Sequence, residues 1–329
     1  MTHLVYAAGG MVNLERRRLG DSELEVSELS LGSWRTYERI PRDAGVAVMR
    51  KAREVGINFL DDARYDDETA TAPVKTGYSE IVFGELFRAS GWKRDEVVLA
   101  NKLWWEFWPE QSAEVELDAS LQRMGMDYLD LAYSERPPPG LAVEEIVRQV
   151  TNLMKTEKLR AWGVLNWPAA LINDAAAAAA KQGVSGPCAA QLPYSLVTRS
   201  PVEDPEMVHA LTSARVSVVA SHTLVGGALS GKYDEPGAKG RIADAVDAAD
   251  YSAALRAGSE LSKFARDLGE RPAPMAIAFA LLNPTVATVL LGATSADQLT
   301  ENLAAIGLKT RMDAETVASL KRIAVSPSG

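Results

Sequence analysis

Three polar side chains of the types that cooperate in proton transfer follow or lie near short apolar runs in this chain. Asp61 follows residues 57–60, and Lys102 comes at the end of residues 97–101. A buried lysine keeps its charge only if an anion holds it, and Asp61 supplies that anion. A tyrosine close to the held charge, such as Tyr65, becomes a better proton donor because a positive charge favours its phenolate. Taken singly, each residue is better explained as part of a structural ion pair or as a packed ring.

The same arrangement recurs along the chain, because polar or small residues follow eight short apolar runs. The runs are residues 29–31, 57–60, 97–101, 128–133, 162–165, 188–190, 216–220 and 286–291. Stretches that predict helices lie between them, among them residues 42–55, 79–89, 111–124, 143–156 and 168–182. Strands that alternate with helices favour parallel βαβ units, and eight units predict a closed (β/α)8 TIM barrel of the α/β class. The loops after the strands build the active site of that fold, so the polar residues there are interpreted as chemical groups.

Residues 15–26, with Gly20 and Asp21 in the middle, predict an N-terminal β-hairpin that can close one end of the barrel. We expect residues 14–329 to form a single domain, since no linker rich in Pro, Ser or Gly interrupts the alternation. Residues 1–13 are interpreted as an extension that could be disordered, with Met1 or Met11 as the native start.

The composition and net charge of the chain limit the kinds of molecule that it is expected to bind and the compartment that it fits. The net charge of −9 disfavours nucleic acid and anionic membranes. No apolar run is long enough to span a membrane, and residues 1–10 do not resemble a signal peptide. Cys188 is the only cysteine, which excludes an internal disulfide and fits a cytoplasmic location. No metal site is predicted.

Further motifs are spread through the chain in a fixed order. They are residues 27–34, 56–61, 79–80 with Gly84, 101–102, 128–131, 163–164 with Asn166, Gln191 with 194–196, Gly227 with 231–233, and 292–294 with 298–299 and 301–302. None is specific alone, but in this order and spacing the chain resembles the aldo-keto reductase family from Arg18 to Asn302. The resemblance implies a barrel that binds NADPH extended across its C-terminal face without a Rossmann domain. The chain itself has no G-x-G-x-x-G motif after a strand.

The resemblance also implies the reaction, in which hydride passes from the nicotinamide to a carbonyl carbon. Tyr65 would protonate the oxygen, helped by Lys102 and Asp61. The implied cofactor contacts are Asn166 and Gln191 at the nicotinamide amide, the loop of Ser221, His222, Thr223, Leu224 and Val225 along the ring and pyrophosphate, Lys232 and Arg241 at phosphate, and Thr294, Gln298, Glu301 and Asn302 at the adenosine end. Ser33, Trp34, Asp61, Gly227 and Gly292 complete the implied cofactor site. Lys232 and Arg241 could otherwise be ordinary solvated charges.

Glu135 departs from the family, which usually has a histidine there that orients the substrate carbonyl. A carboxyl group near Asp61 in a closed pocket is expected to have a raised pKa and to donate a hydrogen bond to an oxygen. The same exchange is found in the steroid 5β-reductase branch of the family, which reduces the carbon–carbon double bond of an enone. Reduction of a conjugated alkene is therefore a second hypothesis. Alternatively, Glu135 pairs with Arg136 or faces solvent.

Two further departures concern the tyrosine and the nicotinamide. Tyr65 lies one residue closer to Asp61 than the family tyrosine usually does. Leu165 replaces a serine, and Ser221 replaces an aromatic residue that stacks on the nicotinamide, a contact worth about 1 kcal/mol. The cofactor should therefore bind more weakly unless another ring, such as that of His222, takes over. The acidic residues nearby are interpreted as loop or turn residues, namely Asp62, Asp66 and Asp67.

The aromatic cluster at residues 104–108, directly after Lys102, is interpreted as a possible substrate wall. With tryptophans of neighbouring loops it suggests a large apolar pocket for an aromatic or polycyclic substrate. The expected lining residues are Trp34, Trp104, Trp105 and Trp167. Alternatively, some of these rings cap the barrel or form a subunit contact.

The sequence thus predicts an NADPH-dependent reductase that acts on a small-molecule carbonyl or enone, with a homo-oligomer as a possible assembly. The competing hypothesis is an NADPH-binding regulatory protein with little catalysis. It is kept because Gln298, Glu301 and Asn302 resemble the adenosine site of the potassium-channel β-subunits.

Overall fold

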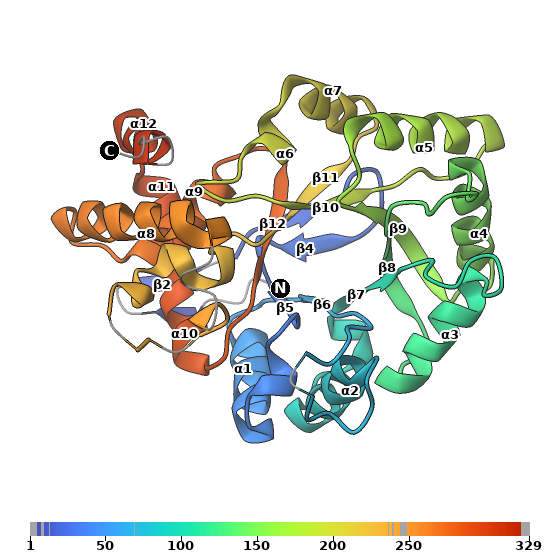
Figure 1. Ribbon diagram of the computed structural model, residues 1–329, viewed down its shortest axis with the longest axis horizontal. Coiled ribbons are helices and arrows are strands. Elements are labelled where there is room, and N and C mark those ends of the chain that lie inside the picture. Colours follow the sequence, from blue (N-terminus) through green and yellow to red (C-terminus); the bar gives the residue numbers. More distant parts are fainter. Residues whose placement is uncertain are drawn as a thin grey trace.

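The computed structural model of the protein describes residues 5–7, 10–12, 14–68, 70–235, 237–238, 240–243 and 249–323. Eight parallel strands close into a barrel in the order β10-β11-β12-β5-β6-β7-β8-β9 (Figure 1). They are β5 (Leu29–Gly32), β6 (Phe59–Asp61), β7 (Val98–Leu103), β8 (Leu129–Ser134), β9 (Leu159–Leu165), β10 (Ala189–Pro193), β11 (Ser217–Ser221) and β12 (Val286–Leu291). The predicted (β/α)8 TIM barrel is confirmed.

Helices surround the barrel (Figure 1). They are α1 (Arg42–Glu54), α2 (Tyr78–Ser90), α3 (Ala113–Met124), α4 (Val143–Lys155), α5 (Ala169–Gln182), α6 (Ser200–Glu203), α7 (Pro205–Ser213), α8 (Ala249–Asp267), α9 (Pro272–Leu281), α10 (Ala296–Asn302), α11 (Ala304–Arg311) and α12 (Ala314–Ile323). The five predicted helices agree with α1 to α5 to within two residues at each end. Local signals explain such limits: the Ser112 hydroxyl accepts the Val115 N–H where α3 begins, and α3 ends at Gly125 in the left-handed conformation. No helix among the described residues is long and apolar enough to cross a membrane.

The barrel strands are buried on both faces, which explains why their sequences are continuous apolar runs rather than alternating ones. All six residues of β7 and all six of β8 are buried. The parallel register places Gly32 opposite Asp61 and Lys102 opposite Tyr133. The polar residues that end neighbouring strands therefore meet at one end of the barrel.

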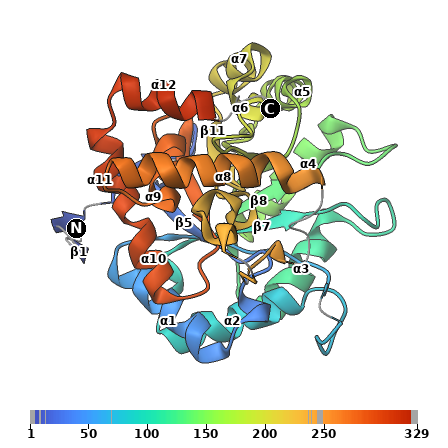
Figure 2. The ribbon, with the colours of Figure 1, turned by 60° about the vertical axis from the view of Figure 1, so that its left-hand side comes forward.

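The predicted N-terminal hairpin is present as β3 (Arg16–Arg18) and β4 (Glu25–Ser27), which pair antiparallel. Leu19, Leu24 and Val26 of this hairpin are buried in one apolar cluster with Phe59 and Val219 of the barrel. The hairpin therefore fills the N-terminal end of the barrel. Ahead of it, β1 (Val5–Ala7) pairs antiparallel with β2 (Gly10–Val12) (Figure 2). Met1 and the other residues of the 1–13 extension that precede, separate or follow β1 and β2 lie outside the described residues, whereas Met11 lies in β2. The boundary of the single domain stays a prediction.

The connection from β11 to β12 carries two helices in place of one. It begins with 3-10 turns at Val225–Ser230 and Lys232–Asp234, which lie beside α8 in Figure 2. Helix α9 is buried nearly all round, as its apolar sequence requires. The loop after β11 is thus supported by helices rather than left free at the barrel mouth.

A buried carboxylate joins the hairpin, the first barrel strand and the C-terminal helices. Glu28 is 0% exposed, and its carboxylate accepts from the Glu15 N–H at 3.2 Å. It also pairs with Lys309 Nζ at 2.5 Å and with Arg17 at 3.3 Å. A fully buried carboxylate is tolerated only with such partners. The network holds α11 against the closed end of the barrel.

Substitution of Lys309 by methionine should lower the free energy of unfolding by about 2 kcal/mol, because Glu28 would remain buried with one cation fewer. A second substitution, Glu28→Gln, should restore part of the loss, since it removes the uncompensated charge. Denaturant unfolding of both variants checks this prediction, and a double variant whose loss equals the sum of the single losses would contradict it.

Candidate active site

The predicted ion pair between the ends of β6 and β7 is present. Lys102 Nζ donates to both carboxylate oxygens of Asp61, at 3.0 and 2.8 Å, and to the backbone carbonyl of Asp62 at 3.0 Å. The Asp61 and Lys102 side chains are each only 3% exposed. The two oxygens belong to one carboxylate and lie too close together for two tetrahedral N–H groups to point at them separately, so one N–H serves the Asp61 carboxylate and a second serves the Asp62 carbonyl.

Tyr65 lies beside this pair but does not gain the expected electrostatic help. Lys102 Nζ is 5.6 Å from the centre of the Tyr65 ring. Burial raises the pKa of Tyr65 well above 10, and the Asp61 and Asp62 carboxylates raise it further. The pKa of Tyr65 is therefore raised rather than lowered, chiefly because burial disfavours the phenolate, and the help that Lys102 gives to the phenol stays a prediction.

Asp62 is a loop residue as interpreted, but it is buried in the site. It is 0% exposed, it accepts a hydrogen bond from the Ser33 hydroxyl, and its Oδ2 is buried without a partner. Burial and the nearby Glu80 carboxylate raise the pKa of Asp62 well above 3.8. The two other acidic residues are turn residues as interpreted, since the Asp66 carboxylate accepts from Thr76 Oγ1 and that of Asp67 from the Ala72 N–H.

Two amide side chains extend the site from the ion pair across β9 and β10. Gln191 is 4% exposed and donates through Nε2 to Asp61 Oδ2 at 3.1 Å, while its Oε1 is buried without a partner. Asn166, directly after β9, is half-buried, and its Oδ1 is also buried and unpartnered. Leu165 before it is buried and offers no polar side-chain atom. Two acceptor oxygens are therefore available near Asp61.

Glu135 follows the end of β8 and is half-buried. Its N–H donates to the Leu103 carbonyl at 2.9 Å, which continues the strand pairing by one residue. Its carboxylate accepts from the backbone N–H of Arg136 at 3.0 Å. The carboxylate is thus engaged with its own loop, and its role toward a substrate oxygen stays a prediction.

Trp34 forms a ring contact across the mouth. The centres of the Trp34 and His222 rings are 4.9 Å apart, and the Arg35 guanidinium lies 4.9 Å from the Trp34 ring. Glu68, from the long loop after Tyr65, forms ion pairs with Arg35 and with Arg39. Trp34 and His222 therefore form an aromatic contact at the mouth of the barrel. The ion pairs of Glu68 fix the loop after Tyr65 beside this contact.

The tryptophans after β7 and β9 differ in their placement. Trp104 is half-buried, and its ring lies edge-on to Tyr65, with ring centres 6.2 Å apart. Trp105 and Trp167 are 2% and 1% exposed and belong to the main apolar core. Trp105 also donates through Nε1 to Ser134 Oγ at 2.8 Å. The expectation that Trp105 and Trp167 line an open pocket is not met, because core packing takes up both rings.

Two cations occupy the other side of the mouth, after β11. Arg241 donates to Thr36 Oγ1 at 2.7 Å, which links the β11 loop to the loop after β5. Arg241 lies so close to Gly292 that a Cβ there would come within 2.2 Å of its Nη2. A Cβ on Gly227 would likewise come within 2.9 Å of Lys232 Nζ. Burial lowers the pKa of both cations, and Arg241 lowers that of Lys232 further. An anion placed between them would relieve this cost.

The remaining predicted cofactor residues lie along the same rim. Ser33 is 1% exposed and Thr223 is 2% exposed with an unpartnered Oγ1. Ser221 ends β11, and His222, Leu224, Val225 and Gly227 follow in the loop. Of these residues, His222, Val225 and Gly227 have positive φ. Beyond β12, the N–H and Oγ1 of Thr294 both donate to Gln298 Oε1, at 3.0 and 2.9 Å. Glu301 pairs with Arg271 at 2.8 Å, and Asn302 is 9% exposed.

These observations fit a dinucleotide. Gln191, Asn166 and Thr223 present buried polar atoms without partners, as a carboxamide-binding site requires. Lys232 and Arg241 supply the positive charge that phosphate binding requires, and Gly227 and Gly292 leave room for their side chains because they have no Cβ. The residues therefore fit a carboxamide and a phosphate group of the predicted ligand, and their contacts with it stay a prediction.

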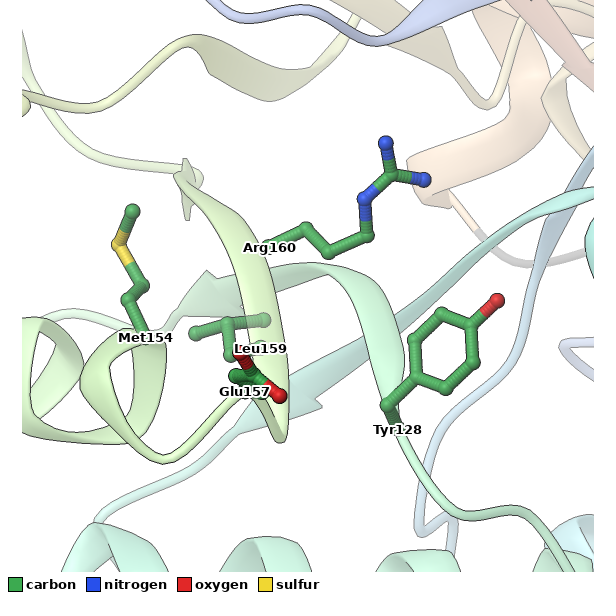
Figure 3. A pocket seen from close by; sticks show the side chains of 5 residues that line it. All are labelled: Tyr128, Met154, Glu157, Leu159 and Arg160. Atoms are coloured by element: carbon green, nitrogen blue, oxygen red, sulfur yellow. The ribbon is translucent and has the colours of Figure 1, made fainter.

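A hollow of about 460 Å³ lies at the opposite, N-terminal end of the barrel (Figure 3). It is lined by Tyr128, Met154, Glu157, Leu159 and Arg160. The Arg160 guanidinium pairs with Asp130 at 2.7 Å. None of the predicted site residues contributes to this hollow, so it is separate from the candidate active site.

Sequence reasoning missed three residues that contribute to the site: Asp62, Thr36 and Arg136. A signal for Asp62 existed, because it continues the polar end of the same strand as Asp61. Thr36 and Arg136 act through contacts with segments more than 25 residues away, and no local pattern marks them.

Comparison with known proteins agrees with this geometry. The model described as "Aldo/keto reductase family" matches residues 28–325. A protein of Oryza sativa subsp. japonica named "Probable voltage-gated potassium channel subunit beta" is 31% identical over 335 residues, covering 95% of this chain and 97% of that protein. A protein of the same name from Arabidopsis thaliana is 30% identical over 308 residues, covering 89% and 91%.

The substitution Asp62→Asn should stabilise the protein increasingly as the pH rises from 4 to 8. Because the folded-state pKa of Asp62 is raised, the folded protein keeps a proton there that the unfolded chain releases above about pH 4. The stability due to this proton is complete at lower pH and is lost as the pH rises toward the folded pKa. Asparagine is neutral throughout and can still accept from Ser33, so the gain at pH 8 should be about 1–3 kcal/mol.

Thermal unfolding of both proteins across this pH range measures the effect. Asp174→Asn, at an exposed position of α5, serves as the control for the loss of one negative charge. Parallel stability curves for the wild type and Asp62→Asn would show that this carboxyl does not carry the expected pH dependence.

Proposed function

This chain belongs to the aldo/keto reductase family, and we propose that it is an NADPH-dependent reductase that converts an aldehyde or ketone to the alcohol. The observation that carries the proposal is the meeting of Asp61, Lys102 and Tyr65 at one end of the barrel, beside two unpartnered amide oxygens. Residues 14–329 would act as a single domain. A cytoplasmic location and a homo-oligomer are part of the same proposal.

The bound reduced nicotinamide would supply the hydride. Asn166 and Gln191 would hold its carboxamide, Ser33, Trp34 and the loop of residues 221–227 its ring and pyrophosphate, and Lys232 and Arg241 the phosphates. Thr294, Gln298, Glu301 and Asn302, with Gly292, would hold the adenosine end. The two cations favour NADPH, because a further phosphate lowers the cost of their proximity.

Tyr65 would donate the proton to the substrate oxygen. Its raised pKa keeps the phenol protonated at neutral pH, so the proton is available when negative charge develops on that oxygen. The same raised pKa makes the phenol a weak acid. Lys102 would assist through its third N–H, because the contacts with the Asp61 carboxylate and the Asp62 carbonyl use only two of its three donors.

An apolar or aromatic substrate is favoured by the rings at the mouth. Trp34 and Trp104 are both half-buried, and Trp104 lies edge-on to the proposed proton donor. Half-buried rings next to a reacting group can bind the apolar part of a ligand and exclude water from it.

Two alternatives rest on particular residues. Glu135 in place of the usual histidine favours reduction of the double bond of an enone, with Glu135 as a hydrogen-bond donor. The resemblance of Gln298, Glu301 and Asn302 to the adenosine site of the potassium-channel β-subunits favours a weakly catalytic NADPH-binding subunit, as does the likeness to proteins named as potassium channel β-subunits.

Substitution of Tyr65 by phenylalanine should lower kcat for NADPH oxidation with a carbonyl substrate by about 100- to 10,000-fold, the usual contribution of a general acid. NADPH affinity should stay unchanged, because the hydroxyl is proposed to act on the substrate alone. Tyr128→Phe, at the other end of the barrel, is the matched control. Unchanged turnover in the Tyr65→Phe variant would exclude the proposed proton donor.

A matched pair of a saturated ketone and its α,β-unsaturated counterpart should both yield alcohols, identified by mass. A saturated ketone as the product from the enone would instead establish double-bond reduction, and Glu135→His should then shift the product toward the alcohol. Tight NADPH binding without oxidation of any substrate would favour the regulatory subunit.

A further inference from the structure

We propose that Arg136 is a positioning residue that holds Asn166 in the conformation needed to bind the nicotinamide carboxamide. The proposal rests on the proposed function, since it concerns the nicotinamide end of the same cofactor site. Arg136 belongs to the loop after β8, and Asn166 follows β9. The two residues are 30 positions apart in the sequence, and one hydrogen bond joins them.

The backbone of Asn166 is fixed from both sides. Its carbonyl accepts from Arg136 Nε at 2.5 Å, and its N–H donates to the Gln191 carbonyl at 3.0 Å. The guanidinium donor is charged, so the first of these bonds is stronger than a bond between neutral groups. Both backbone polar groups of Asn166, one in each of its two flanking peptide units, are therefore used for positioning.

Asn166 needs such fixing because its φ is +56°, in the left-handed region. This conformation costs a residue with a side chain about 1 kcal/mol or more, even though asparagine tolerates it better than most. Without Arg136, the chain after β9 could relax toward negative φ. The direction of the Asn166 side chain would change with it.

The direction of that side chain matters because its Oδ1 is buried and has no partner in the protein. A carboxamide N–H is a suitable donor for this oxygen. Leu165, which precedes Asn166, is apolar and 7% exposed, so it cannot share the task through its side chain. Recognition of the nicotinamide therefore depends more on the orientation of Asn166 in this chain than it would with a polar side chain at position 165.

The contact also connects the rim of the site to its centre. Asn166 donates to the Gln191 carbonyl, and Gln191 in turn donates through Nε2 to Asp61 Oδ2 at 3.1 Å. Arg136 itself is anchored, because its own N–H donates to the Glu135 carboxylate at 3.0 Å. No ion pair among the described residues includes Arg136, so its charge is directed to the Asn166 carbonyl rather than to a carboxylate.

The test compares two ligands that share the adenosine end of the cofactor. NADPH has a nicotinamide, whereas adenosine 2′,5′-bisphosphate does not. Calorimetric titration of the purified full-length protein should show that Arg136→Gln weakens NADPH binding by about tenfold, equivalent to about 1.4 kcal/mol. Binding of adenosine 2′,5′-bisphosphate should not change. Arg136→Lys should show a smaller loss, because an ammonium can donate to the carbonyl but lacks the planar guanidinium geometry.

Arg148→Gln is the matched control, because Arg148 lies on α4, pairs with Glu145 and has no contact with the site. Unchanged binding of adenosine 2′,5′-bisphosphate by Arg136→Gln also demonstrates that the variant is folded. Equal NADPH affinity of wild type and Arg136→Gln, or an equal loss for both ligands, overturns the positioning role. No binding of NADPH to the wild type overturns the proposed function together with this inference.

Discussion

An ammonium group and a carboxylate, both almost completely removed from water, set the conditions for every other group at the C-terminal end of this barrel. Asp61 and Lys102 can stay charged there only because each satisfies the other, with help from the Asp62 carbonyl and Gln191. The barrel contributes the geometry, since Asp61 lies opposite Ala100 on the neighbouring strand, two residues before Lys102. The cost of the arrangement is that burial, together with the Asp61 carboxylate, raises the pKa of Tyr65.

The charges around this pair are segregated. The Asp61 carboxylate gives the region near Tyr65 a negative charge, whereas Arg241 and Lys232 give the rim after β11 a positive one. A ligand with phosphates at one end and a neutral reacting ring at the other matches that division. A nucleotide would compensate the cations without adding negative charge beside the carboxylates, so the same ligand can satisfy both regions.

Strands and helices were predictable because their signals are local: apolar runs for buried parallel strands, and amphipathic spacing for α1 to α5. The Asp61–Lys102 pair was also predictable, since it follows from strand ends that meet in any closed parallel barrel. The direction of individual side chains was not. Trp105 packs in the apolar core, and Asp62 accepts a hydrogen bond from Ser33. Both side-chain positions depend on packing between segments far apart in the chain. The contact of Arg136 with Asn166 is equally long-range, and it carries no local signal.

The closure of the barrel has a consequence for how the protein is made. The first barrel strand, β5, pairs with the last, β12, with Leu29 opposite Val289, and Glu28 meets Lys309 still later in the chain. These contacts have high sequence separation, so their loop closure is slow relative to helix formation. During synthesis at about 5–20 residues per second, the ribosome releases most of the chain before they can form. The parts of the proposed nucleotide site after β5, at the ends of β9 and β10, and after β11 and β12 can therefore come together only near the end of translation.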